Sequence, residues 1–300
     1  MKKYSFIINP ISGVSRKKNI PALIESLFKN TEIEYKILLT ERAGHAIELA
    51  RSEAEKNTDV VVAVGGDGTL NETAHGLGGS KTAIGIIPLG SGNGLARHLK
   101  ISLNPAKALK QLLKGKTISM DAGMLNEHLF LSNAGVGFTG EVIHSFHGNR
   151  IRGFYAYAWY VFRDFLRHKP ETMRIESEGK MLNGKFAFVN VFNASQFGYN
   201  VTLTPEASVQ DGCLVSLCLP YKNRFQFGTA LALTALSRGR MSHSFFQNIK
   251  STEATVHFNG KLLAHIDGDP ITINSVAQFK ILPGYLNVVV PNMNNLEFSS

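Results

Sequence analysis

The stretch from Val60 to Glu72, VVVAVGGDGTLNE, limits the fold of this chain more than any other part of the sequence. It begins as a run of Val and Ala that is too apolar for anything but a buried strand. The run ends in a Gly-Gly-Asp-Gly turn, and the chain then continues in a helical pattern. In an open α/β sheet, ligands bind at the carboxyl ends of strands, where such turns lie. The stretch therefore predicts a ligand site beside a buried strand.

The composition of this turn suits an anionic ligand. Its glycines let the backbone approach closely, and the following helix offers free N–H groups and the positive end of its dipole. Asp67 would repel an anion unless it has a chemical task, such as bridging through magnesium or transferring a proton. An ordinary turn, in which the Asp accepts local amides, is the alternative. This stretch by itself does not decide between the two.

The segments on either side alternate between strand and helix patterns. Strands are predicted at 4–8, 34–40 and 83–87, and helices at 21–29, 43–56, 71–77 and 105–113. From residue 117 the pattern changes to mainly antiparallel strands, interrupted by helical segments at 153–168 and 225–237. We therefore expect an α/β N-terminal domain with a parallel, doubly wound sheet, followed by a β-rich antiparallel, sandwich-like C-terminal domain.

The chain carries 32 Lys and Arg against 23 Asp and Glu, a formal net charge of +9. A basic surface attracts nucleotides, nucleic acids or acidic lipid headgroups. Nucleic acid is the least supported of these partners. The sequence has no recognition motif, and its aromatic residues are not interleaved with lysines as a stacking platform requires.

Membrane-spanning and secretory segments are not expected. No stretch approaches the ~18 apolar residues of a spanning helix, and the apolar run before Asn9-Pro10 is too short for a secretory signal. Cys213 and Cys218 lack a metal-binding spacing and are expected to be buried free thiols, as in a reducing cytoplasm. We therefore expect a cytoplasmic protein with peripheral membrane contact.

Two further turns also follow predicted strands. Asn9-Pro10-Ile11-Ser12-Gly13 can hold phosphate oxygens through backbone amides, and Gly90-Ser91-Gly92-Asn93 is a second glycine-rich turn. Turns at the ends of neighbouring strands can face one ligand. Ordinary strand-ending turns are the alternative in both cases.

Taken together, GGDGTLNE, the upstream IINPISG and the downstream PLGSGNGLAR resemble the diacylglycerol kinase and sphingosine kinase family of lipid kinases. The resemblance covers nearly the whole chain. It implies a nucleotide-binding domain of residues 1–120 with a returning segment at about 286–300, and a lipid-binding domain of residues 121–285. The Gly-Gly-Asp-Gly turn is also shared with NAD kinases.

The resemblance implies ATP and Mg²⁺ as cofactors. It places the nucleotide at Asn9, Pro10, Ser12, Gly13, Thr40, Gly65, Gly66, Asp67, Gly68, Thr69, Asn71, Glu72, Gly90, Ser91, Gly92 and Asn93. For Thr40, a helix-capping role is the alternative. Gly94 stands where many bacterial members carry Asp, a difference that leaves the nucleotide assignment intact.

The resemblance also implies catalytic, substrate and metal residues in the second half. Asp269, with Asp267, is expected to accept the proton of the lipid hydroxyl, and Asp67 to hold magnesium or act as a base. Asp121, Arg150 and Arg152 are expected to contact the substrate. A metal turn is expected at Ser208, Asp211 and Cys213.

Two of these motifs depart from the family pattern. Asp269 stands where the family usually has Glu, which shortens the reach of the carboxylate by one methylene. Gln210 stands where the family has a second Asp, which weakens the expected metal turn. Simple exposed turns are the alternative at both places.

The resulting hypothesis is an ATP-dependent lipid kinase that phosphorylates a hydroxyl of a diacylglycerol-like or sphingoid lipid at a membrane surface. An NAD kinase-like enzyme is one alternative, although no Thr-Gly-Ser-Thr-Ala-Tyr-type segment is present. A non-catalytic nucleotide- or lipid-binding regulator is the other. The aromatic segment after Arg152 is expected to pack in the core, with an interfacial surface as the alternative.

Overall fold

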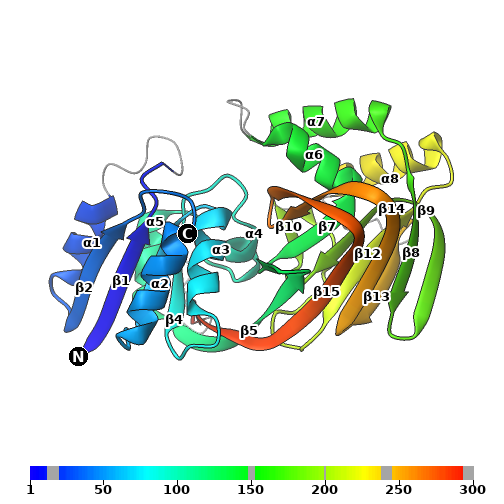
Figure 1. Cartoon of the computed structure of the whole chain (residues 1–300). Helices are drawn as coiled ribbons and strands as arrows, with labels where there is room; N and C mark the ends of the chain where they lie inside the picture. Colours follow the sequence, from blue (N-terminus) through cyan, green and yellow to red (C-terminus); the bar gives the residue numbers. More distant parts are fainter. Residues whose placement is uncertain (12–19, 148–152, 199–200, 238–244, 293–300) are drawn as a thin grey trace. The chain divides into compact units, whose positions relative to one another are not determined.

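The computed structural model describes residues 1–11, 20–147, 153–198, 201–237 and 245–292 (Figure 1). The chain divides into two compact units, the first formed by Met1–Met120 and Gly284–Ser300 and the second by Asp121–Pro283. It passes into the second unit along strand β5 (Lys116–Leu125) and returns along β15 (Asp269–Val290).

The first unit contains a parallel sheet. Its strands are β2 (Ile33–Leu39), β1 (Lys2–Ile8), β3 (Val60–Gly65), β4 (Ala83–Pro88) and the end of β15, in that spatial order. Every neighbouring pair in this order is parallel. Strands β3 and β4 are buried along their whole length, which explains why their sequences are continuously apolar rather than alternating.

Helices connect these strands and pack in pairs. They are α1 (Ile20–Phe28), α2 (His45–Glu55), α3 (Asp67–Leu77), α4 (Gly94–His98) and α5 (Pro105–Lys114). Helix α2 contacts α3, and α1 contacts α5. Helix α5 has a clear sequence origin, because Pro105 starts it and the Asn104 side chain caps it by accepting from the Lys107 amide.

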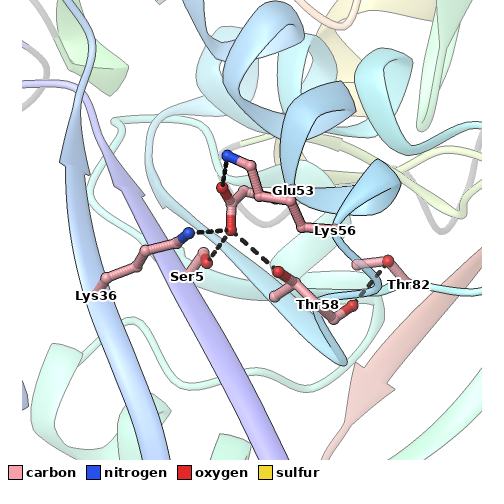
Figure 2. Close-up of polar contacts among 6 residues, drawn as sticks. All are labelled: Ser5, Lys36, Glu53, Lys56, Thr58 and Thr82. Carbon is pink, nitrogen blue, oxygen red and sulfur yellow. Dashed lines mark hydrogen bonds and ion pairs between the residues drawn. The ribbon is translucent and has the colours of Figure 1, made fainter.

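A buried carboxylate fixes α2 to the sheet. The inner face of α2 carries Glu53 beside two alanines, and Figure 2 shows the side chains around it. Its carboxylate accepts hydrogen bonds from Ser5 Oγ (2.6 Å) and Thr58 Oγ1 (3.0 Å). It also pairs with Lys36 Nζ (2.8 Å) and Lys56 Nζ (3.2 Å). Burial by itself raises the pKa of Glu53, but these four donors outweigh it and lower that pKa to about 2.

The second unit is mainly antiparallel. Its main strands are β6 (His128–Phe130), β7 (Asn133–Gly137), β8 (Glu171–Ser177), β9 (Lys180–Phe192), β12 (Leu214–Pro220), β13 (Gln247–Ser251) and β14 (Glu253–Ile266), with a separate pair β10 (Gln196–Gly198) and β11 (Val201–Thr202). The order β13-β12-β9-β7-β14-β15 runs through pairs that are all antiparallel. Strand β8 also pairs with both β9 and β14.

Two apolar cores lie on opposite faces of β9. Phe188 belongs to a cluster that includes side chains of α6 (Phe138–Phe146), α7 (Phe154–Arg167) and α8 (Arg224–Leu236). Its neighbour Val189 belongs to a cluster built from strands. This separation follows from the two-residue alternation of a strand. A helix-covered and a strand-covered face together confirm the predicted antiparallel, sandwich-like second half.

Some elements differ from the sequence expectation. Helix α3 begins directly at Asp67 rather than at residue 71. Helix α6 was not predicted, because it is short and its apolar residues continue those of the strand before it. The returning segment expected at about 286–300 begins inside a long strand, β15, which starts in the second unit at Asp269.

Candidate active site

The strand order of the first unit places the predicted turns at a topological switch point. The chain crosses from β1 to β2 on one side and then to β3 on the other side of β1. Ligands of open α/β sheets bind outside the carboxyl ends of strands at such a point. Asn9 follows β1 at this edge, and Gly66 follows β3. Helix α3 starts immediately after Gly66, so its N-terminal amides are suited to an anion here.

Asn9 joins the first turn to the second. Its backbone amide donates to the Val64 carbonyl oxygen (3.2 Å), and its Nδ2 donates to Thr69 Oγ1 (3.3 Å). Its Oδ1 accepts from the Ile11 amide (2.9 Å). One side chain therefore sets the conformation of its own turn and contacts the first turn of α3.

The glycines at this edge are required by close contact within the protein. A Cβ atom on Gly90 would lie 2.8 Å from the Gly66 Cα, and one on Gly65 would lie 2.5 Å from Thr69 Oγ1. The Leu89 amide also donates to the Gly65 carbonyl oxygen (2.7 Å). The second and third turns therefore pack backbone against backbone, which a larger residue at 90 would prevent.

Asp67 links the same two turns. Its Oδ2 accepts from the Asn93 amide (2.9 Å). Asn93 is buried in a left-handed conformation, with φ 52°. Its side chain accepts from the Gly90 amide (3.1 Å) and donates to the Gly90 carbonyl oxygen (2.7 Å). The Asp67 carboxylate is thus held in a defined position by the neighbouring turn.

Glu72 has a structural contact that the sequence did not suggest. Its carboxylate accepts from the Gly44 amide (2.9 Å) and the Ala46 amide (3.3 Å). It therefore supplies the acceptor at the N-terminus of α2, where a negative charge is favourable. Thr40 is buried at the end of β2, and its amide donates to the Ile8 carbonyl oxygen (3.0 Å).

The remaining nucleotide positions lie on the same turns and on α3. Pro10 and Ser91 are exposed, whereas Gly68, Asn71 and Gly92 are half-buried. Four predicted residues lie outside the described residues: Ser12, Gly13, Arg150 and Arg152.

In the second unit, Asp267 has a structural task. It forms a two-residue hairpin turn with Gly268 between β14 and β15, and both residues have positive φ, 50° and 93°. Its carboxylate accepts three backbone amides, from Leu131 (2.8 Å), Ser132 (2.8 Å) and Asn133 (3.1 Å). Asp269 follows as an exposed residue at the start of β15.

The sequence did not single out Asn193. This residue connects Asp121 to the segment at 131–133, whose amides donate to the Asp267 carboxylate. Its Nδ2 donates to the carbonyl oxygens of Asp121 (2.9 Å) and Leu131 (2.8 Å). Its amide donates to Ser132 (2.9 Å). Asn193 is fully buried. The sequence could have pointed to Asn193, because its amide side chain directly follows a long apolar strand. A buried polar group in such a place must find hydrogen-bond partners.

Hydrogen bonds and one ion pair within the protein hold the predicted metal turn. Asp121 Oδ2 accepts from the Gly212 amide (2.8 Å). Asp211 accepts from the Cys213 amide (3.1 Å) and pairs with Lys250 Nζ (2.7 Å). Ser208 Oγ accepts from the Gln210 amide (3.3 Å).

This turn does not fit a magnesium ion as it stands. Asp211 is already paired with the Lys250 cation, and the described residues contain no group of three or more His, Cys, Asp or Glu that could hold a metal. An ion bound through the Asp211 carboxylate would compete with Lys250. The assignment of Ser208, Asp211 and Cys213 to a metal stays a prediction.

Comparison with known proteins finds a matching family for each half of the chain. Residues 3–125 match the family described as diacylglycerol kinase catalytic domain. Residues 134–290 match the family described as YegS C-terminal NAD kinase beta sandwich-like domain. The two matches follow one another along the chain and together support a kinase. The chain belongs to the diacylglycerol kinase-like family, whose members combine this catalytic domain with the YegS-type C-terminal domain.

Curated relatives agree with the family, and solved structures share the fold. The chain is 27% identical to the diacylglycerol kinase of Bacillus subtilis (strain 168), over 90% of each chain. It is 28% identical to the diacylglycerol kinase of Staphylococcus aureus (strain bovine RF122 / ET3-1), over 97% of this chain and 93% of the relative. A structure named as a diacylglycerol kinase from Bacillus anthracis str. Sterne has a TM-score of 0.75 and 19% identity, with 98% of each chain covered.

The comparisons confirm the fold class and the resemblance seen in the sequence. Within the described residues, no helix is long and apolar enough to cross a membrane.

Proposed function

We propose that this protein transfers the γ-phosphoryl group of ATP to a hydroxyl of a diacylglycerol-like or sphingoid lipid. The observation that carries the proposal is the pair of side-chain links at the switch point, Asn9 to Thr69 and Asp67 to Asn93. They join three turns at one sheet edge of a domain that matches a kinase family. Relatives named diacylglycerol kinase support the choice of acceptor.

In this proposal the first unit binds and orients ATP. Phosphoryl transfer needs mainly positioning and neutralisation of charge. The backbone amides of the turns at 9–13, 65–71 and 90–93 and the N-terminus of α3 would bind phosphate oxygens. Asn9 and Asn93 would keep the turns in register. The contact of Glu72 with α2 gives it a supporting task, so we do not rest ATP binding on it.

Asp67 fits a magnesium ion that enters with the nucleotide. Mg²⁺ is usually bound by one or two carboxylates together with substrate phosphates rather than by an all-protein cage. The single oriented carboxylate of Asp67 meets that requirement without a larger acidic cluster. When bound, the ion would neutralise the phosphate charge that develops during transfer.

In the second unit, Asp269 would take the proton of the lipid hydroxyl. The hydroxyl oxygen then forms a bond to the γ-phosphorus, the bond from that phosphorus to the β–γ bridging oxygen breaks, and ADP leaves. Asp267 would act as a positioning residue, because its carboxylate already accepts three amides. Its own role in proton transfer, which the sequence suggested, receives no support from that geometry.

The test is lipid phosphorylation with labelled ATP and magnesium, over diacylglycerols, sphingoid bases, ceramides and phosphatidylglycerol in mixed micelles, with NAD as a further acceptor. Asp269→Asn should lower kcat at least ~100-fold, the usual size of a general-base contribution. Asp67→Asn should also lower kcat, because it removes the proposed magnesium ligand. Glu127→Gln, at an exposed turn of the same unit as Asp269, is the matched control.

Two results would redirect the assignment. Phosphorylation of NAD and of no lipid would identify an NAD kinase-like enzyme. ATP binding without transfer to any acceptor would identify a non-catalytic regulator.

A further inference from the structure

Helix α7 exposes a continuous aromatic face. Tyr155, Trp159, Phe162 and Leu166 are 89%, 61%, 55% and 49% exposed. Their spacing of four, three and four residues puts them on one side of a helix. A face of this kind on a soluble protein marks an interaction site more often than chance exposure does.

The core does not require this face, because α7 packs through its other side. Tyr157, Tyr160, Val161 and Phe165 contact the cluster beneath α6, α7 and α8. The sequence left core packing and an interfacial surface as alternatives, and the helix has one face suited to each.

Helix α8 extends the exposed area. The Phe165 ring lies 5.4 Å from that of Phe227 on α8, and a Cβ on Gly228 would lie 3.1 Å from the Phe165 ring. The two helices therefore touch, and Figure 1 shows both with α6 along one side of the second unit's strands. We call the exposed apolar side chains of these two neighbouring helices the α7–α8 surface: Tyr155, Trp159, Phe162, Leu166, Phe225 and Leu236.

The exposed charges on α7, on α8 and on the residues next to their ends are basic, and Glu141 of α6 pairs with His168 (3.0 Å). On α7, Asp164 is buried and paired with Arg163 (2.7 Å). In the described segments 153–169 and 221–236, the exposed charged residues are Arg167, Lys169, Lys222 and Arg224. The ring of His168 lies 5.3 Å from that of Phe227. This contact puts the end of α7 beside the start of α8, so the four cations gather at one end of the surface.

We propose that the α7–α8 surface docks on an anionic lipid bilayer. The proposal rests on the proposed function, since it names the membrane from which the enzyme would take its lipid. Tyr and Trp rings favour the headgroup region, where an apolar body and a polar edge are both satisfied. Exposed Lys and Arg are each attracted to anionic headgroups. A second copy of the chain fits less well, because a symmetric contact would bring basic ends together without exposed acidic partners on these helices.

The chain carries its own reporter for this surface, because Trp159 is its single tryptophan. The full chain is mixed with vesicles of phosphatidylcholine with or without about a third phosphatidylglycerol, in the absence of ATP and substrate. With anionic vesicles, Trp159 emission should shift to shorter wavelength and be quenched by brominated lipid. Binding to neutral vesicles should be weaker by at least ~10-fold, given roughly 1 kcal/mol for each cation near the surface.

Phe162→Glu should abolish co-sedimentation with anionic vesicles. Met181→Glu is the matched control, because Met181 is equally exposed at 55% but lies on β9, outside this surface. Arg167→Gln with Arg224→Gln should reduce binding to anionic vesicles and leave binding to neutral vesicles unchanged. Unchanged far-ultraviolet circular dichroism shows that each variant is folded.

Three outcomes would overturn the proposal. The first is a Trp159 emission spectrum that does not change when vesicles are added, and the second is equal vesicle binding by Phe162→Glu and wild type. The third is a dimer that Phe162→Glu dissociates while vesicle binding persists. Phosphorylation of a monomeric short-chain diacylglycerol separates this proposal from the proposed function. Activity on that lipid without vesicle binding overturns only the surface, whereas insertion of Trp159 without any kinase activity supports the surface and overturns the function.

Discussion

At the residue scale, two neighbouring carboxylates have different surroundings. Asp267 accepts three backbone amides, and Asp269 is an exposed strand residue two positions later. The sequence offered both as catalytic candidates because it shows only that two acids flank a glycine. Three-dimensional contacts separate them, since an acid whose lone pairs hold a loop is poorly placed to accept a substrate proton.

We predict that Asp267→Asn lowers the free energy of unfolding by about 1–3 kcal/mol, because the amide group turns an N–H donor toward backbone N–H groups and leaves a part-buried amide without its acceptor. Asp269→Asn should change it by less than about 0.5 kcal/mol, as for an ordinary exposed site, while reducing kinase activity. Chemical denaturation of both variants, with the activity assay alongside, checks this. Equal losses of stability would contradict the division of tasks.

At the element scale, the glycine-rich turns can be recognised from the sequence, although the sequence does not show every reason why glycine is needed there. The sequence indicates that the glycines allow an anion to approach the backbone closely. The structure adds a contact between the turns themselves, Gly66 against Gly90. Helix α6 and the capping of α2 by Glu72 escaped prediction because both depend on neighbours distant in sequence.

We predict that Gly90→Ala destabilises the protein by about 1–3 kcal/mol, the usual result of forcing a methyl group into a tight contact. The new Cβ would lie 2.8 Å from the Gly66 Cα. Gly66→Ala is the matched comparison, since its Cβ would lie at an ordinary 3.4 Å. The urea midpoint should fall clearly more for Gly90→Ala than for Gly66→Ala. A larger loss for Gly66→Ala would mean that the two turns do not pack as described.

At the scale of the whole molecule, stability should depend on pH through one buried group in each unit. Glu53 in the first unit has its pKa lowered from 4.5 to about 2, because four donors outweigh its burial. His265 in the second unit is fully buried, and burial, with a smaller contribution from His144, lowers its pKa from 6.5 to about 3. Neither ring nitrogen of His265 has a hydrogen-bond partner within the described residues.

Both groups make the protein less stable in acid, in different pH ranges. His265 is neutral in the folded protein. Its contribution to the free energy of unfolding is therefore complete above pH 6.5 and is lost as the pH falls toward 3. Glu53 folds as the carboxylate, so its contribution is complete above pH 4.5 and is lost as the pH falls toward 2. The free energy of unfolding should therefore begin to decline below pH 6.5 and decline more steeply below 4.5.

Two variants test which group causes the loss of stability in each pH range, by denaturation curves measured between pH 7 and 3. His265→Leu should flatten the decline between pH 6.5 and 4.5. Glu53→Gln should cost about 1–3 kcal/mol at pH 7 and remove the steeper part below 4.5, whereas Glu55→Gln, at an exposed position of the same helix, should do neither. A wild-type protein that is equally stable at pH 7 and 5 would contradict the role of His265.

The sequence by itself determined the parallel α/β first half, the antiparallel second half, the turns at the carboxyl edge and the kinase family. These properties depend on local periodicity and on short motifs whose residues are adjacent in the chain. Tertiary structure decided which partners the acidic side chains contact. Asp267, Glu53 and Asp211 are each satisfied by groups far away in sequence, on other strands or loops. Local pattern cannot encode such contacts, because the partner of a buried polar group is set by which strands become neighbours.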